Sequence, residues 1–279
     1  MSDRARSSDR RAWDGDPPAD PGEPEVLVAA DPPGCAAIAA ARLAVAIERA
    51  VAGRGRADIA TTGGSTPAGI YAALAAAPPG ERLPWDRLHA WFGDDRFVPR
   101  GHPDSNVTIL DRALVAGRAP EGRLPAGNVH PFPVDASLAA GEGPAACARR
   151  YAEEIRSALP FDEAGRPVFD AVLVGVGPDG HLLSVFPGSG VPRGRDLAAA
   201  VPAPTHVGPH LPRVTLHPAI LDATPVLLVV AFGAAKAPIM ARLLEGPRDL
   251  ADLPAQRARR AGATWVLDAA AASRLRPRG

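Results

Sequence analysis

Short apolar runs rich in β-branched residues alternate with longer Ala-, Leu- and Arg-rich stretches of helical periodicity along most of this 279-residue chain. This order predicts a mostly parallel sheet with helices on both faces, because parallel neighbours need a crossover connection. The run FDAVLVGV at 169–176 is continuously apolar after Asp170, as expected of a central strand covered on both faces. In such sheets ligands bind at the carboxyl ends of the strands, so we expect the functional residues in the loops there.

The individual elements follow from these patterns and their Gly and Pro boundaries. Strands are predicted at 25–30, 58–62, 89–92, 128–132, 169–176, 213–216, 226–232 and 264–267. Helices are predicted at 33–52, 66–77, 105–115, 144–159 and 234–244. No repeat or linker interrupts residues 25–279, so we expect a single α/β domain, a Rossmann-like three-layer sandwich. Residues 1–24 are too poor in apolar side chains to offset the entropy of ordering, which predicts a disordered tail.

Composition excludes several classes of protein. The 31 basic residues balance the 31 acidic ones, so no net field would attract a nucleic acid or an anionic membrane. No window approaches the ~18 apolar residues of a membrane span, and no signal peptide is evident, which favours a cytoplasmic location. Cys35 and Cys147 lie in Ala-rich helical patterns and are expected to be buried, reduced thiols. Of the 31 basic residues only Lys236 is a lysine, although the chain fills every other cationic position with arginine.

The segment GGSTP at 63–67 follows a predicted strand and opens a predicted helix. Its glycines permit a tight turn, Thr66 is expected to cap the helix and Pro67 suits a first helical position. The free amides and the helix dipole would then form a phosphate site. The alternative is a well-capped turn without a ligand. The loop lacks the GK[ST] ending of a P-loop, which disfavours nucleoside triphosphates.

The segment GVGPDGH at 175–181 matches the glycine pattern of dinucleotide-binding folds, and Asp196 follows at a suitable distance. We interpret the match as fortuitous, because the glycines and prolines at 187–192 prevent the long helix that such a fold requires. The segment instead presents His181 after a glycine turn at the end of a central strand. Histidine suits proton transfer near neutral pH, and Asp179 is close enough in sequence to orient it. The alternative is a purely structural histidine.

The segment WFGDDRFVP at 91–99 places two carboxylates and an arginine where an apolar strand ends. Asp94 and Asp95 are candidates to position a base or a sugar hydroxyl, and Arg96 is a candidate to face an anion. The alternative is a solvated turn with a local ion pair. No third carboxylate or histidine stands at a metal-site spacing, so no metal is expected. Arg213 and Lys236 are further candidate anion ligands, unless each is ordinary surface charge; an ammonium is a compact charge suited to a phosphate oxygen.

Taken together and in order, these motifs resemble those of the 6-phosphogluconolactonases, relatives of the glucosamine-6-phosphate deaminases and isomerases. The resemblance covers about residues 25–275. It rests on GGSTP, FGDDRFVP with the downstream Asp104-Ser105-Asn106, GVGPDGH with SVFPGS, RVTL at Arg213, FGAAK ending at Lys236, and the closing LPA and TWVLD segments.

The resemblance implies hydrolysis of 6-phospho-D-glucono-1,5-lactone in the oxidative pentose phosphate pathway, without a metal or organic cofactor. It implies that His181 is the general base and that Arg96 faces the lactone end or the developing negative charge. The implied phosphate anchor consists of Gly63, Gly64, Ser65, Thr66, Arg213 and Lys236. A covalent role for Ser184 is disfavoured, because the GxSxG elbow is missing.

This chain departs from the family pattern at two positions. Asp95 stands where the family usually has Glu, which leaves open whether it bonds Arg96, its own turn or the substrate. Pro212 stands before Arg213, where a polar residue is more usual, so the lead-in to that arginine is expected to differ. Whether Asp95 or Asp179 orients the base is likewise left open.

Two other functions fit the sequence less well. An amino-sugar phosphate isomerase or deaminase would need a catalytic Glu after the DGH turn, and residues 182–190 contain no carboxylate. A sugar-phosphate sensor controlling transcription would need a DNA-binding module, for which the 24-residue tail has no room. We therefore expect a small sugar-phosphate lactone as the ligand. No nucleic acid, membrane or obligate protein partner is expected, and the chain is expected to be a monomer.

Overall fold

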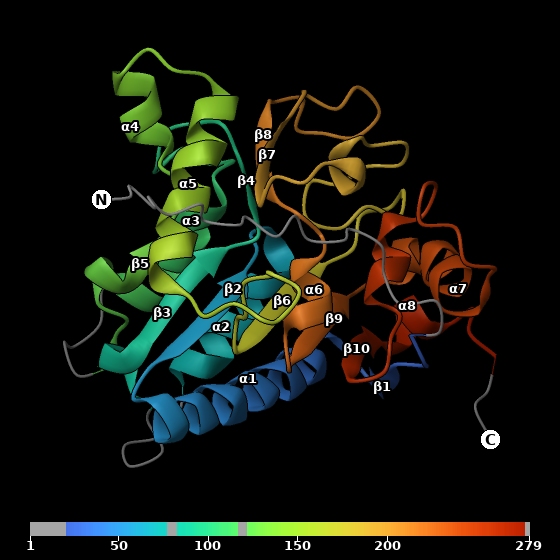
Figure 1. The fold of residues 1–279 in the computed structure, drawn as a ribbon. Helices are drawn as coiled ribbons and strands as arrows, with labels where there is room; N and C mark the ends of the chain where they lie inside the picture. The colour runs from blue at the N-terminus through green and yellow to red at the C-terminus, as the bar shows by residue number, and fades with distance from the viewer. Residues whose placement is uncertain (1–20, 77–82, 117–121, 277–279) are drawn as a thin grey trace, which may run out of the picture.

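Seven parallel strands form the central sheet in a computed structural model that describes residues 21–76, 83–116 and 122–276 (Figure 1). In spatial order they are β1 (Glu25–Ala29), β10 (Ala263–Asp268), β9 (Leu227–Ala231), β6 (Ala171–Gly175), β2 (Ala57–Thr61), β3 (Leu88–Phe92) and β5 (Val129–His130). Every pairing is parallel. The predicted α/β class and the central place of the FDAVLVGV strand are confirmed.

Helices cover both faces of this sheet. They are α1 (Pro32–Arg54), α2 (Ser65–Ala75), α3 (Asn106–Leu110), α4 (Val134–Ala139), α5 (Pro144–Ala158), α6 (Ile220–Ala223), α7 (Ala237–Glu245) and α8 (Ala269–Ala272). α1 crosses one face of the sheet and packs against α2, while α5 lies on the other side (Figure 1). There the buried Tyr151 hydroxyl accepts a hydrogen bond from the Phe92 amide at 2.9 Å.

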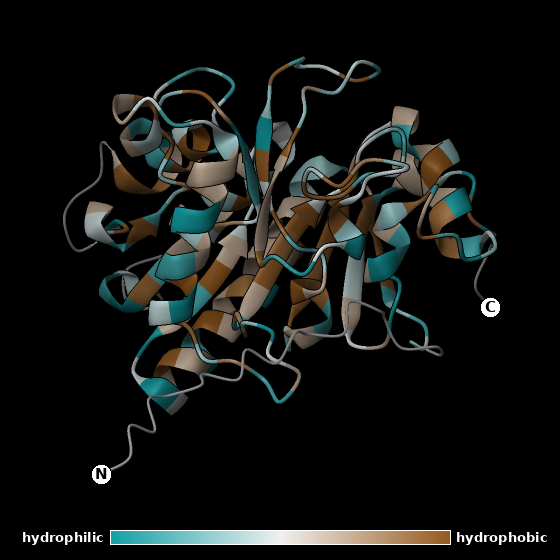
Figure 2. Cartoon of the chain, turned by 45° about the horizontal axis from the view of Figure 1, so that its top comes forward, coloured by the Kyte–Doolittle hydropathy of each residue, from teal (hydrophilic) through white to brown (hydrophobic). Residues whose placement is uncertain are grey.

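The core follows from apolar strands that are buried along their whole length. The side chains of β2, β9 and β10 are all buried, and apolar colour runs along the central strands in Figure 2. Trp91 and Trp265 are among its largest fully buried side chains. Cys35 and Cys147 are buried and unbonded, as predicted, and burial raises the pKa of both thiols to about 11. Within the described residues, no helix combines the length and the apolar character needed to cross a bilayer.

A second, antiparallel sheet stands beside the carboxyl end of β3. It contains β4 (Asp94–Arg96), β8 (Arg213–Leu216) and β7 (Ala198–Val201), in that order. The strand predicted at 213–216 therefore exists, but it does not belong to the parallel sheet. Gly93 makes the junction: its amide donates to Thr61 O and its carbonyl accepts from Leu216 N. A Cβ there would approach Leu183 Cδ2 to 2.6 Å, so a larger residue would require the Leu183 side chain to move.

Several predicted boundaries differ from the observed ones. The strand predicted at 128–132 is only Val129–His130, and the helix predicted at 105–115 is α3 followed by a wider π-helical turn over Asp111–Val115. The helix predicted at 234–244 begins with a 3₁₀ turn, Ala234–Lys236, that precedes α7. Most of the predicted tail, residues 1–20, lies outside the described residues.

Candidate active site

Four neighbouring strands of the parallel sheet, in the order β9, β6, β2 and β3, end at the same edge. Each is followed by one of the motifs singled out in the sequence: FGAAK after β9, GVGPDGH after β6, GGSTP after β2 and GDDR after β3. The chain leaves β2 toward β3 and β5, and later returns to place β6 and β9 on the other side of β2. The boundary between β2 and β6 is thus a topological switch point, where open α/β sheets bind their ligands.

A glycine turn presents His181 at this edge. The Gly177 amide donates to His181 O at 2.8 Å and the Gly180 amide donates to Gly177 O at 3.1 Å. The His181 ring lies against Gly177, where any Cβ would overlap it. Gly180 has φ +88°, a conformation that favours glycine. The glycines thus hold a histidine ring against the main chain, and the segment after Gly180 forms no helix up to Gly190, as predicted.

One carboxylate lies between two imidazoles. Asp179 Oδ1 is 2.5 Å from His181 Nδ1, and Asp179 Oδ2 is 2.7 Å from His206 Nε2. Burial disfavours the charged form of Asp179, but the hydrogen bonds and charge from His181 and the hydrogen bond from His206 outweigh it, so its pKa lies below the ordinary range. An ionised carboxylate only accepts, so His181 Nδ1 carries a proton and Nε2 is left to accept one. Asp179, rather than Asp95, therefore orients this histidine.

Two arginines face each other across the small sheet. Arg96 in β4 pairs with Arg213 in β8 in the antiparallel register. Arg96 Nη1 donates to Asp104 O at 2.7 Å and Asn106 Oδ1 at 3.1 Å, while Arg213 Nη2 donates to Pro209 O at 3.2 Å. Among the described residues neither makes an ion pair, and each has a buried Nε without a hydrogen-bond partner. Burial and the charge of Arg96 lower the pKa of Arg213.

Such a pair is suited to bind an anion. Like charges directly opposite each other destabilise a sheet, and a buried donor without a partner costs free energy. An anionic group between the guanidinium groups would relieve both penalties.

Phe186 connects the arginine pair to the histidine. Its ring centroid lies 4.6 Å from that of His181 and 5.4 Å from Arg213 Cζ, within range of a cation–π contact. The His206 ring meets it edge-on at 5.7 Å. The base candidate and one cation candidate thus share one aromatic neighbour.

The GGSTP loop begins α2 differently from the prediction. The helix starts at Ser65, its N-cap is Gly64 with φ +96°, and no side chain caps it. The predicted Thr66 cap and the first helical position of Pro67 are therefore wrong, because the helix begins before both residues. Because no side chain caps the helix, its first-turn amides are free of that competitor and could donate to an anion. Gly63 lies against Asn106, which accepts from Arg96, so this loop adjoins the arginine pair.

Lys236 reaches the end of β6 from the turn after β9. Its Nζ donates to Val176 O at 2.6 Å, one strand away from the GGSTP loop. Adjacent strands are about 4.8 Å apart, so the ammonium lies at the centre of the edge. Burial lowers the pKa of Lys236, and the charge of Asp179 opposes that shift. It lies in the 3₁₀ turn before α7, rather than in the first turn of that helix as predicted.

Asp94 and Asp95 hold the loop after β4. Asp94 accepts from Ser184 Oγ at 2.5 Å and Asn106 Nδ2 at 3.2 Å, and is 4% exposed. This does not support the expectation that Asp94 contacts a sugar hydroxyl. Ser184, which donates the first of these bonds, is fully buried, and this agrees with its exclusion as a nucleophile.

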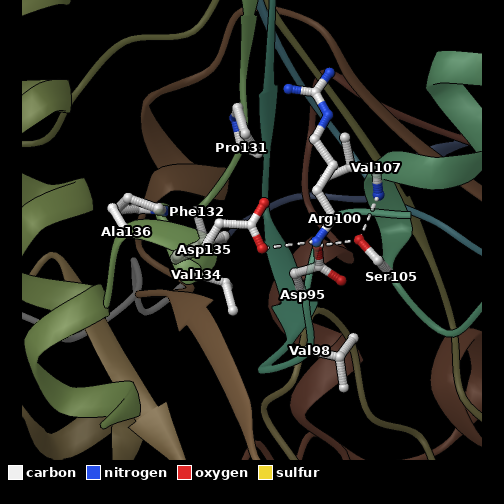
Figure 3. A pocket seen from close by; sticks show the side chains of 11 residues that line it. Asp95, Val98, Arg100, Ser105, Val107, Pro131, Phe132, Val134, Asp135 and Ala136 are labelled. Carbon is white, nitrogen blue, oxygen red and sulfur yellow. Dashed lines mark hydrogen bonds between the residues drawn. The ribbon is translucent and has the colours of Figure 1, made fainter. Parts of the chain in front are cut away.

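Asp95 points into a separate pocket of about 230 Å³ beside Ser105, Phe132 and Asp135 (Figure 3). It accepts from the main-chain amides of Arg96 and Asn106 and from Ser105 Oγ. Of the partners left open by its difference from Glu, the structure shows its own turn, together with the 105–106 segment. Burial raises its pKa to about 7, although these hydrogen bonds oppose the shift.

Three residues at this edge were not singled out as functional in the sequence. Asn106 and Phe186 appeared only as parts of motifs. His206 carried no signal, because it lies in an irregular loop and contacts Asp179, 27 residues earlier in the chain. In the described residues, no group of three or more His, Cys, Asp or Glu side chains is arranged to hold a metal ion.

Comparisons of the sequence and of the fold with known proteins all lead to the same family. The family described as glucosamine-6-phosphate isomerases/6-phosphogluconolactonase matches residues 30–266. A 6-phosphogluconolactonase of Streptomyces coelicolor is 39% identical over 262 residues, which are 90% of this chain and 95% of the relative. One of Nostoc sp. is 34% identical over 82% of this chain and 89% of its own length. The solved 6-phosphogluconolactonase of Trypanosoma brucei superposes with a TM-score of 0.75 at 29% identity, covering 91% of this chain and 99% of that one.

Proposed function

Because this chain belongs to the glucosamine-6-phosphate isomerase/6-phosphogluconolactonase family, we propose that it hydrolyses 6-phospho-D-glucono-1,5-lactone to 6-phospho-D-gluconate, a step of the oxidative pentose phosphate pathway. The observation that carries the proposal is the carboxylate-oriented histidine beside two opposed arginines that form no ion pair with any of the described residues. This combination supplies a base for water and cations for an anionic sugar ester.

The phosphate is assigned to the GGSTP loop with Arg213 and Lys236. Main-chain amides of Gly63, Gly64, Ser65 and Thr66 at the start of α2 would donate to phosphate oxygens. Arg213 adds a planar donor fork and Lys236 a compact charge, both of which suit phosphate. The uncapped start of α2 and the buried, unpartnered Nε of Arg213 support this assignment.

The reaction is assigned to His181. Its Nε2 would accept a proton from water as the water oxygen bonds to the lactone carbonyl carbon. The ring C–O bond then breaks, and the imidazolium returns the proton to the departing ring oxygen. Asp179 holds the ring and stabilises its charge, as in other carboxylate–histidine pairs. General-base assistance of this kind typically contributes ~10²–10⁴ in rate.

Arg96 is assigned to the lactone end, where negative charge develops on the carbonyl oxygen. Its Nη1 is held by Asp104 O and Asn106 Oδ1, so the guanidinium is fixed before the ligand arrives. A pre-oriented cation stabilises an oxyanion without a cost of reorganisation. A six-membered lactone is already activated, so water, a base and such a cation suffice without a metal or covalent nucleophile.

A lactonase assay tests the proposal. Freshly generated 6-phosphogluconolactone is supplied in the presence of a chelator, and the spontaneous hydrolysis rate is subtracted. We expect turnover by the wild type, a loss of about 10²-fold or more in kcat for His181→Ala, and retained binding of 6-phosphogluconate by that variant. Absence of turnover would refute the lactonase function. Full turnover by His181→Ala would refute the base assignment alone.

A further inference from the structure

The loop between β7 and β8, residues 202–212, brings a second histidine to the candidate base. His206 lies in this loop, 27 residues after Asp179, and its Nε2 contacts the carboxylate oxygen that His181 does not use. The Asp179 side chain is 18% exposed and that of His206 49% exposed. The carboxylate is therefore shared between one inner and one outer imidazole.

Other contacts place this loop against the site. The Pro209 carbonyl accepts from Arg213 Nη2, and His210 Nδ1 donates to Pro204 O at 2.6 Å, which ties the loop to itself. The Phe186 ring also contacts both histidines, with its centroid 4.6 Å from that of His181 and 5.7 Å from that of His206. His206 is thus held on two sides, by a carboxylate and by an aromatic ring.

From this geometry we propose that His206 is a positioning residue, which fixes the Asp179 carboxylate and tunes the proton affinity of His181 through it. The inference rests on the proposed function, in which His181 is the base. In its neutral form His206 donates Nε2–H to one oxygen of Asp179, and the other oxygen of the ionised carboxylate still accepts from His181. In its protonated form it adds a positive charge on the far side of the same carboxylate, which disfavours a second charge on His181.

The consequence is a defined change in pH dependence. Because both rings contact the same carboxylate, a positive charge on the outer ring disfavours a second one on His181, and removing the outer ring removes this effect. The other charged groups facing the cluster are Lys236, whose charge acts on Asp179, and Arg213 across Phe186. Both are present in every variant compared, so differences between variants report His206.

Two substitutions separate position from charge. In His206→Gln an amide keeps a donor for Asp179 but cannot be protonated, so kcat should change little while the acidic limb of kcat/KM moves to higher pH by about one unit. His206→Ala removes the donor as well, so the limb should move at least as far and kcat should fall by about 2–10-fold. KM for the phosphorylated lactone should change less than kcat.

His210→Ala is the matched control, because it loosens the same loop without removing a contact to Asp179. It should leave the acidic limb in place. If His210→Ala moves the limb equally, or if neither His206 variant moves it, the positioning role is overturned.

A second readout does not depend on catalysis. In a histidine-ring NMR titration of the full-length protein, His181 should protonate at higher pH in His206→Gln than in the wild type. Identical titration curves would overturn the inference even in an active enzyme. An inactive wild type with a shifted curve would instead refute the lactonase function and leave the coupling of the two rings in place.

Discussion

Replacing Arg213 by methionine should separate ligand binding from folding stability. Arg213 is 3% exposed, faces Arg96 in the paired strand and has a buried Nε without a partner. Methionine is unbranched and of similar reach, so it can fill the space against Phe186 without the charge.

The structure sets the expected size of both effects. Removing the charge relieves the repulsion between the opposed arginines, typically ~0.2–1 kcal/mol for such pairs. It also removes a buried donor without a partner, which costs ~1–3 kcal/mol in the wild type. It also loses the hydrogen bond to Pro209, ~1 kcal/mol, and the contact with Phe186, ~0.5–2 kcal/mol. These nearly cancel, so the ligand-free variant should be as stable as the wild type to within about 1 kcal/mol.

Substrate use should respond very differently. A fork of two charge-assisted hydrogen bonds to phosphate, each worth ~1.5–3 kcal/mol, corresponds to about a 10²–10⁴-fold loss of kcat/KM. The loss should appear with 6-phosphogluconolactone and be small with unphosphorylated glucono-1,5-lactone. Thermal unfolding with and without inorganic phosphate provides the second measurement: phosphate should raise the Tm of the wild type more than that of Arg213→Met.

Two results would refute this reasoning. Equal losses with both lactones would show that Arg213 does not contact the phosphate. A ligand-free Arg213→Met that unfolds many degrees below the wild type would show that the arginine serves the fold rather than the ligand.

Two further changes test neighbouring groups. Lys236→Ala should raise KM for the phosphorylated lactone by about 10-fold or more and leave that for glucono-1,5-lactone nearly unchanged; the exposed Arg242→Ala, which loses only a surface pair with Asp252, is the control, and equal changes with both substrates would contradict the anchor role. Asp95→Asn tests the pocket-facing carboxyl, whose pKa burial raises from 3.8 to about 7. Because the unfolded chain releases this proton first, wild-type stability should fall relative to the variant as pH rises from about 4 to about 7. Urea unfolding across that range measures the difference, and parallel curves would contradict it.

The parallel sheet and the four motif-bearing loops could be predicted because both are local signals. A strand such as 171–175 is recognisable from its own apolar residues, and parallel strands bring their carboxyl ends to one edge whatever the details of packing. His181 is a candidate because it follows such a strand, and Lys236 because it is the only lysine and lies just after another one.

The antiparallel sheet could not be predicted in the same way. β4 is only Asp94–Arg96, with no apolar alternation, and its partner β8 begins at Arg213, far along the chain. The strand pairing forms only when the segment after Gly93 comes to lie beside residues 213–216, and this depends on the tertiary fold. The helix start at α2 was also mispredicted: Gly64 rather than Thr66 occupies the cap, and the neighbouring Gly63 lies against Asn106, a contact between segments far apart in sequence.

The amino-acid sequence by itself therefore determined the fold class, the edge that bears the site and the candidate base, since each depends on residues adjacent in the chain. Only the tertiary structure decided that Asp179 rather than Asp95 orients His181, that Arg96 and Arg213 oppose each other, and that His206 shares the carboxylate. These relations depend on distances of a few ångströms between segments far apart in sequence, and such distances are set by packing rather than by local pattern.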